Sequence, residues 1–366
     1  LHIPFERNRI MDLALANTKK RMIEESAVVS IHATDVVNND DIYIIAANAT
    51  MLQYAASIFP QSIQMCGAER RIKFVTVEQY QEVASEHLTE VSDNDDECED
   101  FCVEDFFNHL GASRDSTILV YAHTLDSTQT VLLDHCKGYQ NIVCTTDIQT
   151  NGKGRKSNAW LSPEGCLMFS FKSIVQNSDY VGQMQYLIAL VMCEAIKQLK
   201  GLSELDINIK WPNDIYVNKR TKICGIISYA TYLNGQYDLV SGAGLNVSNR
   251  KPTTCLEEEV KAKTGKVIHI SRGELLGRFM EIWNRYFDRF SKSGLGPFLD
   301  RYYAQWLHTN QRVRVLSEDG KFTNVTIRGI DNSGFLVAVD DNGNQLKLLS
   351  DGNTFNFLEG LISKKI

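Results

Sequence analysis

A short loop at residues 150–160 places glycines and cations side by side. Gly152 and Gly154 allow backbone angles that are closed to other residues, so the chain can approach a ligand closely. Lys153 and Arg155 alternate with them and offer N–H donors to an anion. Phosphate is the anion that this pattern predicts. Such loops bind many anions and some are only tight turns, so the loop alone is weak evidence.

A second polar segment, Lys210-Trp-Pro-Asn-Asp214, begins about sixty residues after that loop. Pro212 cannot donate a ladder hydrogen bond and biases Trp211 toward an extended conformation, so the chain is predicted to turn here. Asn213 and Asp214 would then project from a fixed corner, although a solvated turn is the alternative. Loop and corner together predict a pocket for a charged small molecule.

Five segments of the chain, taken in order, carry a resemblance to a known family. They are Leu125-Asp-Ser-Thr-Gln129, the glycine-basic loop with Trp160-Leu-Ser-Pro163, Lys210-Trp-Pro-Asn-Asp-Ile-Tyr216, Lys222-Ile-Cys-Gly-Ile226 and Gly242-Ala-Gly-Leu-Asn246. In types and order they resemble the biotin protein ligases, most closely the eukaryotic holocarboxylase synthetases. The match runs from about Tyr121 to the C-terminus. Five segments in family order make coincidence improbable.

The resemblance implies a fold and a reaction. The fold is α+β, with a mixed, mainly antiparallel sheet and helices as in the catalytic domain of class II aminoacyl-tRNA synthetases. The substrates are biotin and ATP with Mg²⁺, which give biotinyl-5′-AMP, and a lysine of a carboxylase's biotin carrier domain then accepts the biotin. The alternatives are a lipoate or octanoate protein ligase of the related fold, and a noncatalytic biotin-binding regulator.

For the biotin end of the pocket, the resemblance points to neutral hydrogen-bonding groups and to the loop. The residues it implies are Ser127, Thr128, Gln129, Gln149, Gly152, Lys153, Gly154, Arg155 and Lys222. The first four would face the ureido ring. Capping of the following helix is the alternative role for Ser127 and Thr128, since their hydroxyls can satisfy N–H groups of its first turn.

For ATP and the adenylate, the resemblance implies a set that overlaps the biotin set: Lys153, Arg155, Trp160, Asn213, Lys222 and Asn246. Lys222 is expected to bridge the biotin carboxylate and the α-phosphate, and Arg155 to hold the phosphate of the intermediate. Asp214 completes the catalytic group, either as the Mg²⁺ ligand or by orienting Lys222. The alternatives are a surface role for Lys222 and a core role for Trp160.

Hydrophobic periodicity predicts the elements that must position these residues. Strands are expected at 118–122, 142–146, 166–172, 207–211, 223–229 and 238–241, and helices at 103–110, 130–135, 180–199 and 272–290. Four short strands at 313–316, 324–330, 335–339 and 345–349, separated by Asp, Asn and Gly turns, predict a small C-terminal β-barrel.

The first hundred residues predict a separate segment. A helix at 10–25, a strand at 41–47, a helix at 49–58 and a strand at 72–77 are expected. Eight carboxylates follow between Asp93 and Asp105, which favours a flexible linker over an acidic docking site. The predicted division is therefore an N-terminal α/β segment of open role at 1–100, a biotin- and ATP-binding catalytic domain at 101–308 and the barrel at 309–366.

Composition excludes several classes of protein. The 366 residues carry a net charge of −7, which argues against nonspecific nucleic-acid binding, because that depends on a basic surface. No apolar run of the length that spans a bilayer is visible, so no membrane partner is expected. Nine scattered cysteines without zinc-site spacing fit a reducing compartment. The cytoplasm is the expected location, with mitochondria left open as a second one.

Overall fold

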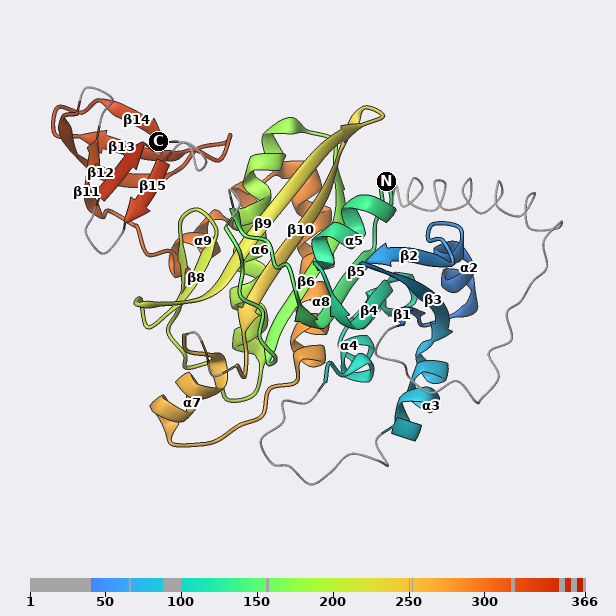
Figure 1. The fold of residues 1–366 in the computed structure, drawn as a ribbon. Helices are drawn as coiled ribbons and strands as arrows, with labels where there is room; N and C mark the ends of the chain where they lie inside the picture. The colour runs from blue at the N-terminus through green and yellow to red at the C-terminus, as the bar shows by residue number, and fades with distance from the viewer. Residues whose placement is uncertain are drawn as a thin grey trace, which may run out of the picture.

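The computed structural model describes residues 41–364 apart from 66, 88–99, 156–157, 250, 252, 317–319, 349–352 and 357–360. Two sheets organise this part of the chain, a ten-stranded sheet in the order β2-β3-β1-β4-β5-β6-β10-β9-β8-β7 and a separate six-stranded sheet near the C-terminus (Figure 1). The predicted helix at 10–25 and most of the acidic run lie outside the described residues.

The centre of the large sheet is the mixed, mainly antiparallel sheet that was predicted. Its strands are β4 (Ile118–Leu125), β5 (Ile142–Gln149), β6 (Cys166–Val175), β10 (Gln236–Asn246), β9 (Thr221–Leu233), β8 (Asp214–Val217) and β7 (Ile207–Lys210). In this run β4 and β5 pair in parallel, and every later pair is antiparallel. Each predicted strand is present, and most extend beyond the predicted bounds because polar residues continue the ladders.

Alternation along the strands gives the sheet two apolar faces. Tyr43 and Ile45 belong to one buried cluster, whereas Ile42 and Ile44 belong to the other. The first face is covered by α3 (Val77–His87), α4 (Val103–Asn108), α6 (Ser178–Gln198) and α8 (Arg272–Ser293), and the second by α2 (Ala49–Ala56) and α5 (Thr128–His135). The sheet is therefore the middle layer, with the core on both sides.

The long helices α6 and α8 form the larger part of that core. The predicted apolar stripe of α8 is buried, and Phe279 and Trp283 pack edge-on against rings of β6, with Phe279 4.9 Å from Phe169 and Trp283 4.7 Å from Phe171 between ring centroids. Ser170 lies between these two phenylalanines, so its side chain must point to the opposite face. At β6 the first face is thus filled by apolar packing, so the polar side chain of Ser170 lies on the second face.

The N-terminal strands belong to the same sheet as strands β4 to β10. β1 (Ile42–Ala46) pairs antiparallel with β4 and parallel with β3 (Ala68–Thr76), and β3 pairs with β2 (Ser62–Met65). A domain boundary near residue 100 is therefore contradicted by the sheet, which crosses it. Strand pairing between segments far apart in sequence leaves no trace in local periodicity, so the sequence could not reveal this union.

The C-terminal strands β11 (Arg312–Leu316), β12 (Phe322–Ile330), β13 (Leu336–Asp340) and β14 (Gln345–Leu348) match the prediction. Two further strands, β15 (Asn353–Asn356) and β16 (Leu361–Lys364), give a mainly antiparallel sheet in the order β14-β13-β12-β11-β16-β15. The predicted small barrel is, over the described residues, this six-stranded sheet, with no pairing recorded between β14 and β15 to close it. Tyr186 of α6 donates a 2.6 Å hydrogen bond to the Gly334 carbonyl and ties the two parts together.

Two further helices, α7 (Leu256–Thr264) and α9 (Leu299–Gln305), and the 3-10 turns η1 (Gly111–Ser116) and η3 (Gly296–Phe298) connect these layers. Among the described helices, none combines the length and the apolar character needed to cross a membrane.

Candidate active site

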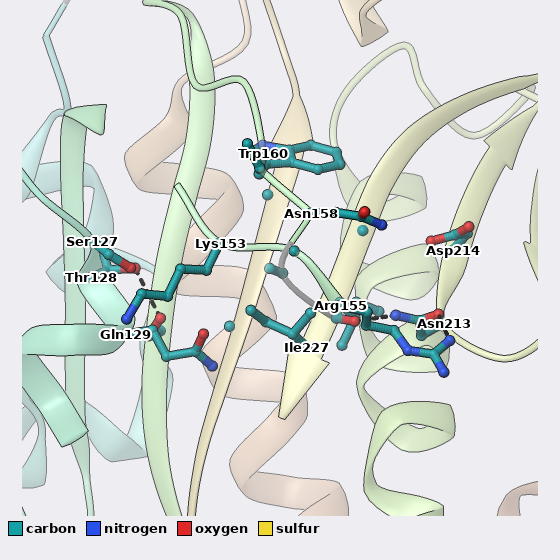
Figure 2. A pocket seen from close by; sticks show the side chains of 18 of the residues that line it. Ser127, Thr128, Gln129, Lys153, Arg155, Asn158, Trp160, Asn213, Asp214 and Ile227 are labelled. Carbon is teal, nitrogen blue, oxygen red and sulfur yellow. Dashed lines mark hydrogen bonds between the residues drawn. The ribbon is translucent and has the colours of Figure 1, made fainter. Parts of the chain in front are cut away.

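A cavity of about 410 Å³ opens on the second face of the sheet, above β6, β9 and β10 (Figure 2). The turn before α5, the glycine-basic loop and the corner between β7 and β8 form its walls. Eleven residues predicted for the site line it: Ser127, Thr128, Gln129, Gln149, Lys153, Gly154, Arg155, Trp160, Asn213, Asp214 and Lys222. The structure therefore gathers residues from segments almost a hundred positions apart.

One end of the cavity is lined by neutral polar groups that hold one another. The Gln149 side-chain oxygen accepts hydrogen bonds from the Thr128 backbone N–H at 3.0 Å and from its hydroxyl at 3.3 Å. The Thr128 and Ser170 hydroxyls are 2.8 Å apart, and Gln149 Nε2 donates to Ser162 at 3.1 Å. These bonds fix the turn before α5 against the base of the glycine-basic loop. A wall of this kind suits a neutral ligand with both donors and acceptors.

The capping role considered for this turn is wrong. Ser127 is the N-cap residue of α5, but its side chain makes no capping hydrogen bond. Helix α5 begins at Thr128, two residues earlier than predicted, and the Thr128 hydroxyl turns to Gln149 and Ser170. Gln129 donates to the Val240 carbonyl at 3.3 Å, while its buried Oε1 has no partner among the described residues. That oxygen is available to a ligand donor.

The other end of the cavity is strongly cationic. Three basic side chains, Arg155, Lys210 and Lys222, line it beside Asp214, the one carboxylate among the lining residues that the structure describes, whereas the fourth basic lining residue, Lys153, extends to the neutral wall and donates a 2.8 Å hydrogen bond to the Thr130 hydroxyl of α5. Such an excess of positive charge in a recess attracts a polyanion. Arg155 donates to Asn213 Oδ1 at 3.1 Å, and Asn213 in turn donates to the Ile226 carbonyl. The loop is therefore held against the corner that the proline forms.

Asp214 lies between two of these cations. Its Oδ1 is 2.7 Å from Lys222 Nζ and its Oδ2 is 3.9 Å from Lys210 Nζ. A bulge in the β8–β9 ladder puts Lys222 opposite Tyr216 and Gly225 opposite Asp214. Lys222 Nζ also lies 5.4 Å from the centre of the Trp160 ring. The Lys222 ammonium is thus set between the carboxylate and the indole.

Lys210 is a cavity residue that the sequence did not single out. It pairs directly with Asp214 in the β7–β8 ladder, which brings the two side chains together. Burial lowers the pKa of Lys210, the Asp214 carboxylate opposes this effect, and the nearby charges of Lys222 and Arg155 lower the pKa further. The signal that could have identified it was a lysine four residues before Asp214 across a proline turn.

Glycines form the floor beneath Trp160. Gly225 of β9 and Gly244 of β10 are paired in register. A Cβ at Gly244 would lie 2.4 Å from Trp160 Nε1, and one at Gly225 would lie 3.0 Å from a ring carbon. The indole fits only because both side chains are absent. Trp160 is thus a cavity residue resting on the sheet, and its buried indole N–H has no partner among the described residues.

Two predicted residues do not line the cavity. Gly152 closes the base of the loop, where its carbonyl accepts a 2.9 Å hydrogen bond from the Trp160 N–H and a Cβ would meet the Trp160 carbonyl oxygen at 2.4 Å. Asn246, at the end of β10, donates to the Thr253 hydroxyl at 2.9 Å and to the Thr254 carbonyl at 3.1 Å. In this structure both residues shape the surroundings of the cavity.

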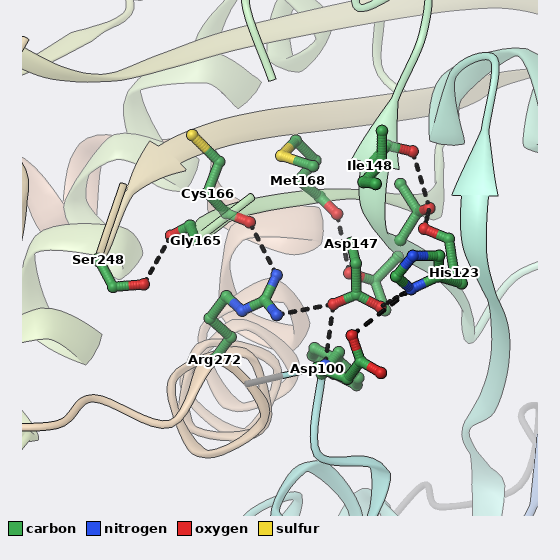
Figure 3. Close-up of polar contacts among 12 residues, drawn as sticks. Asp100, His123, Asp147, Ile148, Gly165, Cys166, Met168, Ser248 and Arg272 are labelled. Atoms are coloured by element: carbon green, nitrogen blue, oxygen red, sulfur yellow. Dashed lines mark hydrogen bonds and ion pairs between the residues drawn. The ribbon is translucent and has the colours of Figure 1, made fainter. Parts of the chain in front are cut away.

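A buried ionic cluster secures the strands that lead to the cavity (Figure 3). Asp147 accepts hydrogen bonds from Arg272 at 2.7 Å and from the Tyr121 hydroxyl at 2.5 Å. His123 Nδ1 lies 3.5 Å from an Asp100 oxygen and 3.6 Å from an Asp147 oxygen. Asp100 and then Asp147 raise the pKa of His123 to about 10 against the opposing effect of its partial burial. The cluster joins β4, β5 and α8.

Comparison with known proteins identifies the family and supports the fold. The profile of the "Biotin/lipoate A/B protein ligase family" matches residues 121–246, and that of the "Biotin protein ligase C terminal domain" matches residues 308–355. A solved structure, "Biotin protein ligase from Aquifex aeolicus in complex with biotin and ATP", superposes with a TM-score of 0.51 at 24% identity, over 63% of this chain and 95% of that one. This likeness supports the predicted fold.

Two relatives from Arabidopsis thaliana extend the match. "Biotin–protein ligase 1, chloroplastic" is 39% identical over 268 residues, which cover 71% of this chain and 73% of that protein. "Biotin–protein ligase 2" is 38% identical over 268 residues, covering 71% of this chain and 81% of that protein. The resemblance seen in five short segments is thereby confirmed over most of both chains. This chain belongs to the biotin protein ligase family.

Proposed function

We propose that this protein activates biotin with ATP and Mg²⁺ and then transfers it to a lysine of a protein acceptor. The observation that carries the proposal is the composition of the cavity described above. A neutral donor and acceptor wall lies at one end, where Lys153 also reaches Thr130, and three cations lie at the other, with Lys222 between Asp214 and Trp160. An acid with an uncharged polar head and a nucleotide triphosphate would meet in such a cavity.

In this proposal the neutral wall binds the ureido ring of biotin. Thr128 already donates two hydrogen bonds to Gln149, so both are preorganised, and Gln129 Oε1, which has no partner among the described residues, can accept from a ureido N–H. Ser127 lies beside them in the cavity wall. A fixed polar wall discriminates strongly against an acid that lacks matching groups, because its own polar atoms would then be left unpaired.

The cationic end would bind the phosphates during the first half-reaction. The carboxylate oxygen of biotin attacks the α-phosphorus, an O–P bond forms, and the bond to pyrophosphate breaks. Lys222, beside Lys210 and Arg155, would hold the attacking carboxylate and the α-phosphate together and stabilise the charge on phosphorus. Trp160, Asn213 and Asn246 are proposed on the adenylate side, with Asn246 acting from behind the cavity wall.

The described residues fit Mg²⁺ in one way. Asp214 is the carboxylate of the cavity, and Mg²⁺ commonly takes one or two carboxylates together with substrate phosphates. Asp214 would therefore hold the ion jointly with ATP, and the ion would neutralise phosphate charge. Since Lys222 is 2.7 Å from the same carboxylate, Asp214 also orients that ammonium.

In the second half-reaction, the neutral amine of an acceptor lysine attacks the carbonyl carbon of biotinyl-5′-AMP. A C–N bond forms, the C–O bond to AMP breaks, and the amine gives up a proton. We propose the biotin carrier domains of biotin-dependent carboxylases as acceptors, since the chain belongs to a family of ligases named for joining biotin to protein. Gly152, Lys153 and Gly154 would close over the adenylate and keep water from it.

We propose the cytoplasm as the site of this activity. The seven cysteines that the structure describes, out of nine in the chain, form no disulfides, which supports a reducing compartment.

The test is modification of a carrier domain in the presence of ATP, Mg²⁺ and one acid at a time: biotin, lipoate or octanoate. We expect the intact mass of the carrier to increase by one biotinyl group with biotin alone, and replacement of its acceptor lysine by arginine to abolish the increase. Modification with lipoate or octanoate in place of biotin would overturn the proposal. Tight biotin binding without any modification or adenylate would indicate a regulator instead.

A further inference from the structure

Arg70 is a buried cation in the N-terminal part of the sheet, outside the active-site cavity. It lies on β3 and is 7% exposed, whereas the side chain of its neighbour Arg71 is 72% exposed. A guanidinium taken out of water is costly unless its donors are satisfied. Arg70 Nη1 donates a hydrogen bond to the backbone carbonyl of Thr124, on β4. The cation of one strand therefore holds the backbone of another.

The register of the sheet explains how Arg70 reaches Thr124. β1 lies between β3 and β4, with Ile42 opposite Ile72 on one side and Tyr43 opposite Tyr121 on the other. Arg70 comes two residues before Ile72, and Thr124 three residues after Tyr121, so both lie at the end of the sheet where the paired part of β1 begins. The long side chain of Arg70 spans the width of a strand to join its neighbours.

Thr124 is the residue from which the wall of the cavity starts. The next carbonyl, of Leu125, accepts a 3.0 Å hydrogen bond from the Thr150 N–H, and that of Asp126 accepts a 2.9 Å bond from the Asn151 N–H. Ser127, Thr128 and Gln129 follow at once and line the cavity. The contact with Arg70 thus holds the end of β4 from the side of β3, while β5 and the residues that follow it hold Leu125 and Asp126 from the other side.

We infer that Arg70 is a positioning residue for biotin, and that through it the strands β1 to β3 form part of the biotin-binding apparatus. The inference rests on the proposed function and deepens it. By holding the Thr124 carbonyl, Arg70 helps to fix the position from which the 125–129 turn leaves the sheet, and thereby the positions of the Thr128 and Gln129 polar groups. The cationic end of the cavity is built by Arg155, Lys210 and Lys222, which come from other segments of the chain.

Three variants separate this role from general stability. Arg70→Met keeps the apolar stem and removes the donors, Arg70→Lys keeps the charge and one donor group, and Arg71→Met is the matched control on the next, exposed residue. We would measure the Kd for biotin by titration calorimetry, the KM for ATP at saturating biotin, and thermal unfolding for each variant.

We expect Arg70→Met to weaken biotin binding about tenfold, the effect of losing a hydrogen bond from a charged group, with the KM for ATP unchanged within about twofold. Arg70→Lys should recover part of the biotin affinity, and Arg71→Met should match the wild type. Wild-type biotin affinity in both Arg70 variants would overturn the inference. Parallel losses of biotin affinity, ATP affinity and melting temperature would also overturn it, since they would indicate a merely structural arginine.

Failure of the proposed function is read from the wild-type protein alone. If the wild type binds lipoate or octanoate and not biotin, the proposed substrate is wrong whatever the variants do. If the wild type binds biotin and Arg70→Met binds it equally well, only the inference about Arg70 fails.

Discussion

At the scale of single residues, the affinity of the site for phosphates depends on the charged side chains that lie together at one end of the cavity. Lys222 and Lys210 approach opposite oxygens of Asp214, and Arg155 lies nearby on the loop. The sequence could indicate Lys222 and Arg155, because each lies in one of the five segments whose order resembles a known family. Lys210 was missed although it lies four residues before Asp214, because the sequence does not show that these two residues pair in the β7–β8 ladder.

We expect Lys210 to lower the stability of the fold and to strengthen phosphate binding. Its burial disfavours the charged form, so Lys210→Met should leave the melting temperature unchanged or raise it by about 1–3 °C. The same change removes one cation from the phosphate end and should raise the KM for ATP about tenfold, with the biotin Kd unchanged. Pyrophosphate exchange measures the KM for ATP, and calorimetry measures the melting temperature and the biotin Kd. Lys200→Met, on an exposed lysine, is the control, and an unchanged KM for ATP would contradict this account.

At the scale of elements, two strands and a loop build one surface. Period-two alternation turns Ser170, Gly242 and Gly244 toward the cavity while Phe169 and Phe171 face the helices. The strands themselves could be predicted, because alternation and β-branched residues are local signals. The role of Gly225 and Gly244 could not be predicted, since the sequence does not show that the Trp160 ring fills the space left by their missing side chains. The capping error has the same origin, because the partners of Thr128 lie on other strands.

The glycine floor makes a specific prediction for Gly244→Ala. The new Cβ would lie 2.4 Å from Trp160 Nε1, so the indole must move, although the backbone of β10 can hold alanine. Because Trp160 is proposed to contact the adenylate, the KM for ATP should rise at least about tenfold. Kinetics of pyrophosphate exchange measure this, and Gly296→Ala, where a Cβ meets nothing within 4 Å, is the control. Equal kinetics in the two variants would refute the proposed place of Trp160.

At the scale of the whole molecule, the sheet unites parts that the sequence divides. Strands β1 to β3 extend the catalytic sheet, and Tyr186 fixes the C-terminal sheet to α6. The order of elements and the character of the catalytic part could be predicted from pattern and resemblance. The continuity across residue 100 could not, because an acidic stretch looks like a linker whether or not the strands on its two sides pair.

The ionic cluster that joins these parts predicts a pH dependence of stability. The folded-state pKa of His123 is raised from 6.5 to about 10 by Asp100 and Asp147. Its contribution is therefore fully present below about pH 6.5 and is lost as the pH rises through about 10. Between pH 7 and 10 the wild type should lose melting temperature faster than His123→Asn. Parallel curves of melting temperature against pH would show that the cluster does not depend on a protonated histidine.

The most direct test of the account is the rate of biotin-dependent exchange of labelled pyrophosphate into ATP, compared between the wild type and Lys222→Ala. The central claim is that the cavity joins biotin to the α-phosphate through Lys222, so the wild type should exchange and the variant should be slower by about a hundredfold or more. Lys200→Ala should exchange pyrophosphate at the wild-type rate, and the neutral polar wall should remain intact in Lys222→Ala. Near-normal exchange by Lys222→Ala, or none by the wild type, would contradict the account.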